Sequence, residues 1–111
     1  MLDFLGTLQR THMCGELRAS DASGKVVLMG WINRRRDLGN LIFLDLRDRT
    51  GIAQVLITAE AGAELHKKAE TLRSEYVIAV IGQCKLRDPG TVNKNIPTGE
   101  IEVVADEIPW K

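Results

Sequence analysis

The chain has 111 residues, the size of one ordinary domain that can bury a core without disulfides or a metal. Its content of 44% hydrophobic and 27% charged residues is typical of a globular domain and excludes a disordered or fibrous protein. Fifteen basic residues balance fifteen acidic residues, so the net charge does not indicate a polyanionic partner. We expect one domain that folds on its own.

The cysteines and the hydropathy of the chain indicate its compartment. Cys14 and Cys84 are far apart in the sequence, and neither has a cysteine or histidine at zinc-ligand spacing. Unpaired thiols of this kind are typical of a reducing compartment. No apolar run approaches the length of a membrane span, and the first residues lack the layout of a signal peptide. The sequence therefore predicts a cytoplasmic protein without a metal or a membrane contact.

The first strand is expected to follow a mixed N-terminal arm. Residues 1–24 contain several glycines and end in a polar cluster, which indicates an irregular arm with room for one short helix. Residues 25–35 are rich in β-formers and are predicted to form a strand, in which Gly30 marks a bulge or a sharp bend. Turn-forming residues follow at 37–40.

Alternation in the next two strands separates an inward face from an outward face. Residues 41–47 and 52–57 are predicted strands joined by a tight hairpin at 48–51. The predicted inward residues are Ile42, Leu44, Leu46, Ala53, Val55 and Ile57. Phe43 and Gln54 fall on the opposite face. Two adjacent strands thus present an aromatic ring and an amide on the outside of the sheet.

The second half of the chain is predicted to form one helix and two strands. Apolar residues recur at helical spacing over residues 60–73, which indicates one amphipathic helix. Its apolar face comprises Leu65, Ala69, Leu72 and Tyr76. A strand containing Gly82 is predicted over residues 76–87, followed by a polar loop over residues 88–99. Residues 100–105 form the last predicted strand. Its inward residues are Ile101 and Val103, and Glu102 faces outward.

The order β-β-β-α-β-β is the layout of an all-β, five-stranded OB-fold Greek-key barrel in which the single helix closes one end. Glycines in the first and fourth strands supply the bends that barrel closure requires. A ferredoxin-like sandwich would need a helix between the first two strands, where only a short turn is present. We predict an arm over residues 1–24, the barrel domain over residues 25–108 and a tail over residues 109–111.

The outward residues Phe43, Gln54 and Glu102 suggest nucleic-acid binding. OB barrels bind oligonucleotides on the face formed by their second and third strands. An aromatic ring there can stack on an unpaired base, which contributes about 1–3 kcal/mol per base. An amide and a carboxylate can hydrogen-bond to base edges. Taken singly, Phe43 could equally belong to an apolar patch, and Glu102 could be a solvated strand residue.

The arginine run 34–36 ends the first strand beside this face, and guanidinium groups suit phosphate contacts or stacking on bases. Asp37 follows at once, so part of the run is expected to form ion pairs. His12 and His66 have no serine, cysteine or carboxylate at a recognisable catalytic spacing, and no glycine-rich phosphate loop is present. The sequence offers no catalytic residues, and we do not expect the chain alone to be an enzyme.

Long segments resemble the N-terminal anticodon-binding domain of bacterial-type aspartyl-tRNA synthetases. The main segment is WINRRRDLGNLIFLDLRDRTGIAQV at residues 31–55. Shorter segments are MCGELR at 13–18, RSEY at 73–76 and PTGEIEV at 97–103, so the resemblance covers nearly the whole chain. Asparaginyl- and lysyl-tRNA synthetases share the phenylalanine and the glutamine of the outward face. The RRRDLGNLIFLDLRDRTG run and the TGEIEV segment favour aspartate.

The resemblance implies roles for individual residues. Phe43 would stack on the central uridine of the anticodon, and Gln54 would hydrogen-bond to that base. Arg36 would support the anticodon bases or their phosphates, and Glu102 would read the first base. The family has leucine or histidine at the position of Leu38, and leucine resembles the forms restricted to aspartate tRNA. The full set of expected nucleic-acid contacts is Arg34, Arg36, Leu38, Phe43, Gln54, Asn93 and Glu102.

The resemblance also implies partners. A synthetase of this family continues into a class II catalytic domain that uses ATP and Mg, and the motifs of that domain do not occur in these residues. The expected partners are the anticodon loop of an aspartate-type tRNA, a class II catalytic domain and, in the full-length enzyme, a second copy of the protein. The chain itself is expected to need no cofactor. The alternatives are a free-standing OB-fold module that docks another protein and a generic single-stranded nucleic-acid binder.

Overall fold

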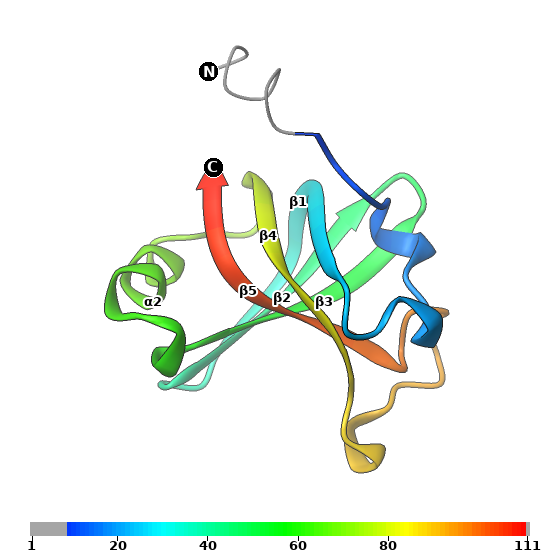
Figure 1. The fold of residues 1–111 in the computed structure, drawn as a ribbon. Helices are drawn as coiled ribbons and strands as arrows, with labels where there is room; N and C mark the ends of the chain where they lie inside the picture. The colour runs from blue at the N-terminus through cyan, green and yellow to red at the C-terminus, as the bar shows by residue number, and fades with distance from the viewer. Residues whose placement is uncertain (1–8, 111) are drawn as a thin grey trace.

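The computed structural model describes residues 9–110 and contains a closed five-stranded barrel (Figure 1). The strands are β1 (Lys25–Asp37), β2 (Leu41–Asp48), β3 (Gly51–Thr58), β4 (Val77–Leu86) and β5 (Ile101–Trp110). Their order around the barrel is β1-β2-β3-β5-β4, and β4 pairs with β1 to close it. All neighbours are antiparallel except β3 and β5, which are parallel. The predicted OB-type barrel with one α-helix is confirmed.

Strict alternation along the strands builds one core inside the barrel. Every inward residue predicted for β2, β3 and β5 is fully buried. The barrel contributes Val26, Leu28, Ile32, Ile42, Leu44, Leu46, Ala53, Val55, Ile57, Ile78, Val80, Ile101, Val103 and Ala105 to the core. Burial of such aliphatic side chains is the main favourable term in folding, at about 25 cal/mol per Å² of apolar surface. The last strand ends at Trp110, beyond the predicted end at residue 105.

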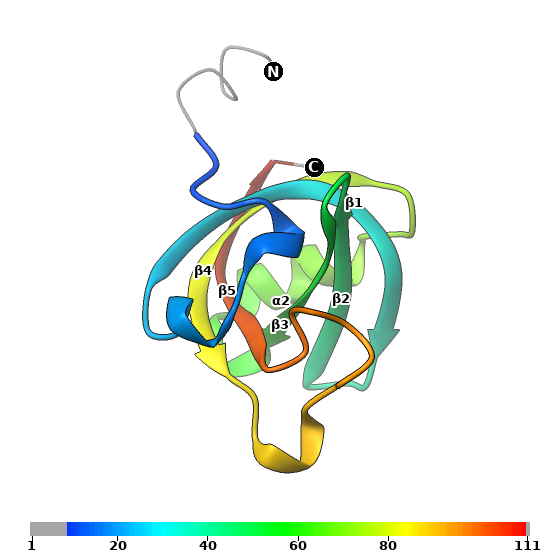
Figure 2. The same ribbon diagram turned by 90° about the vertical axis from the view of Figure 1, so that its right-hand side faces the viewer.

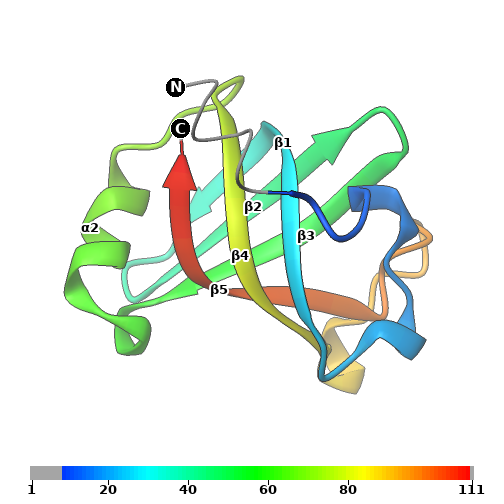
Figure 3. The same cartoon turned by 45° about the horizontal axis from the view of Figure 1, so that its top comes forward.

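The helix α2 (Ala63–Glu70) closes one end of the barrel, as Figures 1 and 3 show. It is shorter than the predicted span of 60–73, because Gly62 precedes it with a φ of 136° that cannot continue from the short 3-10 helix at Ala59–Ala61. The predicted apolar residues pack on the core: Ala69 in α2 and Leu72 just after it are buried, and Leu65 packs against the core. Tyr76, which the helical spacing placed on the same face, is instead 44% exposed and lies directly before β4.

The described part of the N-terminal arm packs on the other end of the barrel, in front of the strands in Figure 2 with α2 behind them. It forms two short 3-10 helices, Cys14–Glu16 and Ala19–Asp21, where the sequence indicated room for one helix. Cys14 and Leu17 are fully buried in the core. The arm is therefore not a loose appendage over these residues, because it completes the apolar interior of the barrel.

A carboxylate in the β2–β3 hairpin fixes the arm. Asp48 accepts hydrogen bonds from the backbone N–H of Cys14 at 2.7 Å, from the N–H of Thr50 at 2.8 Å and from the Thr50 hydroxyl at 2.6 Å. Burial raises the pKa of Asp48, but these hydrogen bonds outweigh it, and the net result is a lowered pKa. The turn predicted at residues 48–51 is thus also the anchor of the arm.

The bulge in β1 lies at Asn33 and not at Gly30. The register of the β1–β2 ladder shifts between Ile32 and Arg34, which leaves Asn33 as the extra residue. Gly30 allows a close approach instead, since a Cβ there would lie 2.3 Å from the carbonyl oxygen of Arg47. Gly82 does mark an irregularity, because the β4–β5 register shifts beside it.

Candidate nucleic-acid interface

The bulge at Asn33 divides the three consecutive arginines between two faces of the sheet. Beyond the bulge, Arg34 pairs with Asp45 and Arg36 pairs with Phe43, so both arginines share the outer face of β2. Arg35 pairs with the buried Leu44 and points to the α2 end. Its guanidinium lies 3.1 Å from Asp37 and donates to the carbonyl oxygen of Glu70 at 3.2 Å. The ion pair expected for part of the run is therefore present at Arg35, while Arg34 and Arg36 stay on the outer face.

The outer faces of β1, β2 and β3, together with the loop at 88–99, enclose a groove of about 510 Å³. Its lining residues are Arg34, Arg36, Leu38, Phe43, Asp45, Ile52, Gln54, Arg87, Thr91, Asn93 and Ile96. Six of the seven residues predicted to contact nucleic acid are in this set. The seventh, Glu102, joins it through a hydrogen bond to Gln54. Residues from five separate parts of the chain are thus brought to one site.

Phe43 and Arg36 form a stacked pair in the lining of this groove. The guanidinium carbon of Arg36 lies 4.9 Å from the centre of the Phe43 ring, within the range of a cation–π contact. Phe43 is only partly buried, so the ring can still receive a flat ligand. An aromatic ring beside an exposed positive charge is an arrangement that suits an unpaired base and its phosphate.

Gln54 and Glu102 place paired polar groups beside this ring. Gln54 Nε2 donates to Glu102 Oε1 at 3.0 Å, across the parallel contact between β3 and β5. The outward direction predicted for Gln54 is correct, yet the residue is only 8% exposed because its neighbours in the groove cover it. The amide therefore has little freedom to rotate.

Arg87 was not predicted as a site residue, although its guanidinium is the most buried positive group of the groove. Nε donates to the carbonyl oxygen of Ile101 at 2.7 Å, and Nη1 donates to that of Thr91 at 3.3 Å. Burial lowers the pKa of Arg87, and the nearby carboxylates of Glu102 and Asp45 oppose this effect. The only signal in the sequence was an arginine between a strand and a polar loop, which also describes many exposed arginines.

The turn between β1 and β2 carries Leu38 at its tip, where 63% of the residue is exposed. Asp37 holds this turn by accepting a hydrogen bond from the Gly39 N–H at 2.9 Å. That bond, assisted by Arg35, lowers the pKa of Asp37. His66 braces the turn from α2 through a 2.7 Å contact between Nε2 and the carbonyl oxygen of Gly39. A large apolar side chain is thus held in the open at the rim of the groove.

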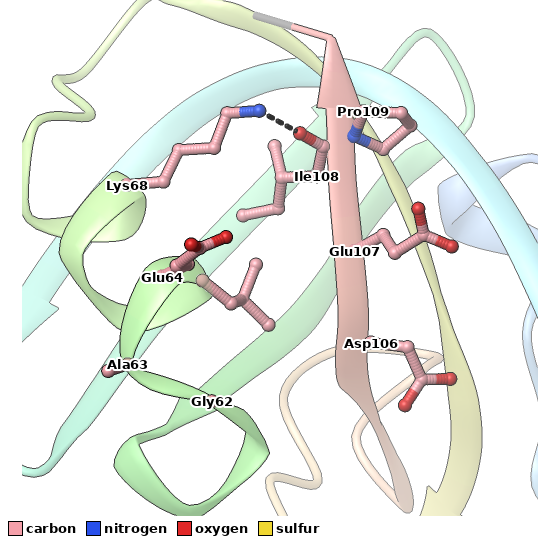
Figure 4. A pocket seen from close by; sticks show the side chains of 9 residues that line it. Gly62, Ala63, Glu64, Lys68, Asp106, Glu107, Ile108 and Pro109 are labelled. Carbon is pink, nitrogen blue, oxygen red and sulfur yellow. Dashed lines mark hydrogen bonds between the residues drawn. The ribbon is translucent and has the colours of Figure 1, made fainter.

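A second pocket, of about 600 Å³, lies between α2 and β5 (Figure 4). Its charged lining residues are Glu64, Lys68, Asp106 and Glu107. The ammonium of Lys68 donates to the carbonyl oxygen of Ile108 at 2.6 Å and so lies against the backbone of β5. The pocket has three carboxylates and one engaged ammonium, which repel phosphate. The groove has three arginines against the carboxylates of Asp45 and Glu102, and this excess of positive charge attracts phosphate. The groove is therefore the better site for a polyanion.

The histidines and cysteines differ partly from expectation. Each histidine has a carboxylate neighbour: Glu70, one helical turn after His66, lies 4.0 Å from it, and the fold brings Asp21 to 3.4 Å from His12. Both cysteines are buried free thiols, as predicted. Within residues 9–110, no group of histidine, cysteine and acidic side chains is arranged to hold a metal ion. None of the helices in that range is long and apolar enough to cross a membrane.

Comparison with known proteins assigns the barrel to a family. The tRNA anticodon family, described as the OB-fold nucleic acid binding domain, matches residues 26–109. The chain is 58% identical over 108 residues to the aspartate–tRNA(Asp/Asn) ligase of Acidobacterium capsulatum and 55% identical over 107 residues to that of Geotalea uraniireducens. These matches cover 97% and 96% of the chain but 18% of each ligase. The chain thus spans about a fifth of the length of these relatives.

The same barrel occurs in solved synthetases. The asparaginyl-tRNA synthetase of Pyrococcus horikoshii, solved with asparaginyl-adenylate, superposes with a TM-score of 0.77 at 28% identity. That match covers 94% of this chain and 22% of the synthetase. The chain therefore belongs to the tRNA anticodon family of OB-fold nucleic acid binding domains, and over nearly its whole length it is similar to a segment of aspartate–tRNA(Asp/Asn) ligases.

Proposed function

We propose that the groove binds the anticodon loop of an aspartate-type tRNA by base stacking and base-edge hydrogen bonds. The observation that carries this proposal is the Phe43 ring, set 4.9 Å from the Arg36 guanidinium in a groove with three arginines and a paired amide and carboxylate. Phe43 would stack on the central uridine and Gln54 would bond to it. Glu102 would read the first base.

The positive side chains of the groove would hold the phosphates. Arg34 and Arg36 are exposed enough to reach a flexible backbone, whereas Arg87 is fixed deeper in the groove. Phosphate contacts position the loop, and base contacts select it. Asn93, from the loop at 88–99, adds an amide to the lining of the groove. Binding by this set would weaken with added salt, by about 0.7 log units of affinity per log unit of salt for each phosphate neutralised.

In a longer protein, this chain would work with a class II catalytic domain. The relatives are named as aspartate–tRNA(Asp/Asn) ligases, which supports a role in charging tRNA. We propose the cytoplasm as the compartment. The catalytic domain would supply the ATP and Mg chemistry, and the groove would bring the correct tRNA to it. We infer that the chain by itself makes and breaks no bond, and that self-association belongs to the full-length enzyme.

The first test is a titration at fixed salt with an aspartate anticodon stem-loop and with a matched loop whose central uridine is replaced by adenosine. We expect preference for the uridine loop, and a loss of about 5- to 150-fold in affinity on Phe43→Ala, because one base loses its stacking partner. Tyr76→Ala removes an exposed aromatic ring outside the groove and should leave binding unchanged.

Two outcomes would contradict the proposal. Equal binding of both loops would indicate a generic single-strand binder. Failure to bind either loop, together with a change in self-association on Phe43→Ala, would indicate that the groove docks a protein.

A further inference from the structure

The hydrogen bond between Gln54 and Glu102 has a defined direction. A carboxylate accepts hydrogen bonds and donates none, whereas an amide has a donating nitrogen and an accepting oxygen. Gln54 must therefore turn Nε2 toward Glu102, as the 3.0 Å contact shows. Because Gln54 is only 8% exposed, few other orientations are open to it. Its oxygen, Oε1, is left for a ligand in the groove.

An accepting oxygen at this point selects between the two pyrimidines. Uridine carries a hydrogen on N3 and can donate to Oε1, whereas the N3 of cytidine is itself an acceptor. Two facing acceptors in a covered site would leave both unsatisfied, which corresponds to about tenfold or more in affinity. The uridine preference of Gln54 therefore depends on the direction in which its amide is held.

Glu102 is well placed to hold that direction. Its charge interacts with that of Arg87, whose guanidinium is fixed by the carbonyl oxygens of Ile101 and Thr91 at 2.7 and 3.3 Å. This attraction raises the pKa of Arg87 and so opposes the effect of burial. Glu102 uses Oε1 for Gln54, which leaves Oε2 for a second donor. One carboxylate thus contacts the amide and can also contact a neighbouring base.

We propose that Glu102 is a positioning residue for the second anticodon base in addition to a reader of the first. By fixing the amide of Gln54, it couples the recognition of the two bases, so that a mismatch at one position alters the cost of a mismatch at the other. This inference rests on the proposed function of the groove. It differs from independent reading, in which each side chain contributes separately.

The variant that tests the coupling is Glu102→Gln, which keeps the shape of the side chain and can donate as well as accept. The amide of Gln54 can then turn over, and we expect the central uridine-over-cytidine preference to fall from about tenfold to about twofold or less. Glu100→Gln removes the same charge from an exposed residue of the same chain segment and should keep the preference. Thermal melting checks that both variants fold. An unchanged preference in Glu102→Gln would overturn the inference.

A second measurement needs no variant. In the unaltered chain, a central 3-methyluridine should bind as weakly as cytidine, because the methyl group removes the N3 hydrogen. Four loops that combine guanosine or adenosine at the first position with uridine or cytidine at the second then form a thermodynamic cycle. We expect the penalty for first-position adenosine to shrink about threefold or more when the second base is cytidine.

The results separate this inference from the proposed function. The chain could prefer uridine while the affinity loss for first-position adenosine stays the same with either second base. In that case the coupling is wrong and the anticodon role remains. If the chain binds the loops without any uridine preference, both are wrong.

Discussion

Leu38 is the residue at which the choice between two related tRNAs is expected. It stands at the rim of the groove with 63% of its surface exposed, on a turn held by Asp37 and His66. Aspartate and asparagine anticodons differ only in the third base, which is cytidine or uridine. An aliphatic side chain there offers no donor to the O4 atom of uridine, which is consistent with a preference for aspartate tRNA even though the relatives are named for both.

Leu38→His should shift this choice toward uridine. An imidazole N–H can donate to the uridine O4, and one such bond corresponds to about two- to tenfold in affinity. The measurement is the ratio of dissociation constants for loops that differ only in the third base. Leu41→His places the same group on a neighbouring exposed leucine outside the groove lining and should leave the ratio unchanged. A ratio that stays constant in Leu38→His would remove Leu38 from the specificity set.

Arg87 shows how a buried charge supports the site through the backbone. Arg87→Lys keeps the charge but loses the planar fork that joins the carbonyl oxygens of Thr91 and Ile101. We expect a loss of about 1–3 kcal/mol in the free energy of unfolding, measured by urea denaturation, and weaker loop binding. The exposed Lys85→Ala, two residues earlier in β4, should lower the stability little. A variant as stable as the parent would contradict this role.

Among the elements, the β2–β3 hairpin joins the arm to the barrel through the carboxylate of Asp48. The pKa of Asp48 is lowered in the folded chain, so its stabilising effect is present above the unfolded pKa of about 3.9 and is lost as the pH falls through the folded value. Asp48→Ala also leaves the N–H groups of Cys14 and Thr50 without their acceptor.

Asp48→Ala should therefore cost about 1–3 kcal/mol in the free energy of unfolding at neutral pH. The difference from the parent should shrink in acid, where the parent carboxyl also becomes protonated. Urea denaturation at neutral and acidic pH gives both values. Asp88→Ala changes an exposed aspartate and should have little effect at either pH. A constant difference across this range would show that the charge of Asp48 does not stabilise the fold.

The sequence predicted those elements whose geometry follows from short-range patterns. The inward faces of β2 and β3 were correct because a half-buried strand must alternate, and Phe43 and Gln54 followed from the same rule. The division of the arginine run was predicted only in outline, since the phase shift at Asn33 depends on the partner strand. Arg87 was missed because its acceptors, Thr91 and Ile101, lie in the following loop and strand, whose path a linear pattern does not specify.

For the whole molecule, both thiols are enclosed by the fold. Cys14 and Cys84 are fully buried, at the arm and in β4. Burial, assisted by Asp21, raises the pKa of Cys84 to about 11, and burial together with Asp48 raises the pKa of Cys14 still further. Since the thiolate is the reactive form, we expect both to resist a disulfide reagent at neutral pH and to react together in denaturant. Rapid modification of either thiol in the native chain would contradict this packing.

The separation of charge between the groove and the pocket beside α2 gives the molecule an electrical orientation. Fifteen positive and fifteen negative residues cancel in sum, yet arginines gather in the groove and carboxylates gather between α2 and β5. An approaching RNA experiences this uneven electric field and not the net charge of the chain. The field exerts a torque that turns the groove toward the RNA before the two molecules touch. Added salt would screen this electrostatic attraction at separations beyond about 10 Å at 0.1 M. A neutral domain can in this way be captured by a polyanion in the correct pose.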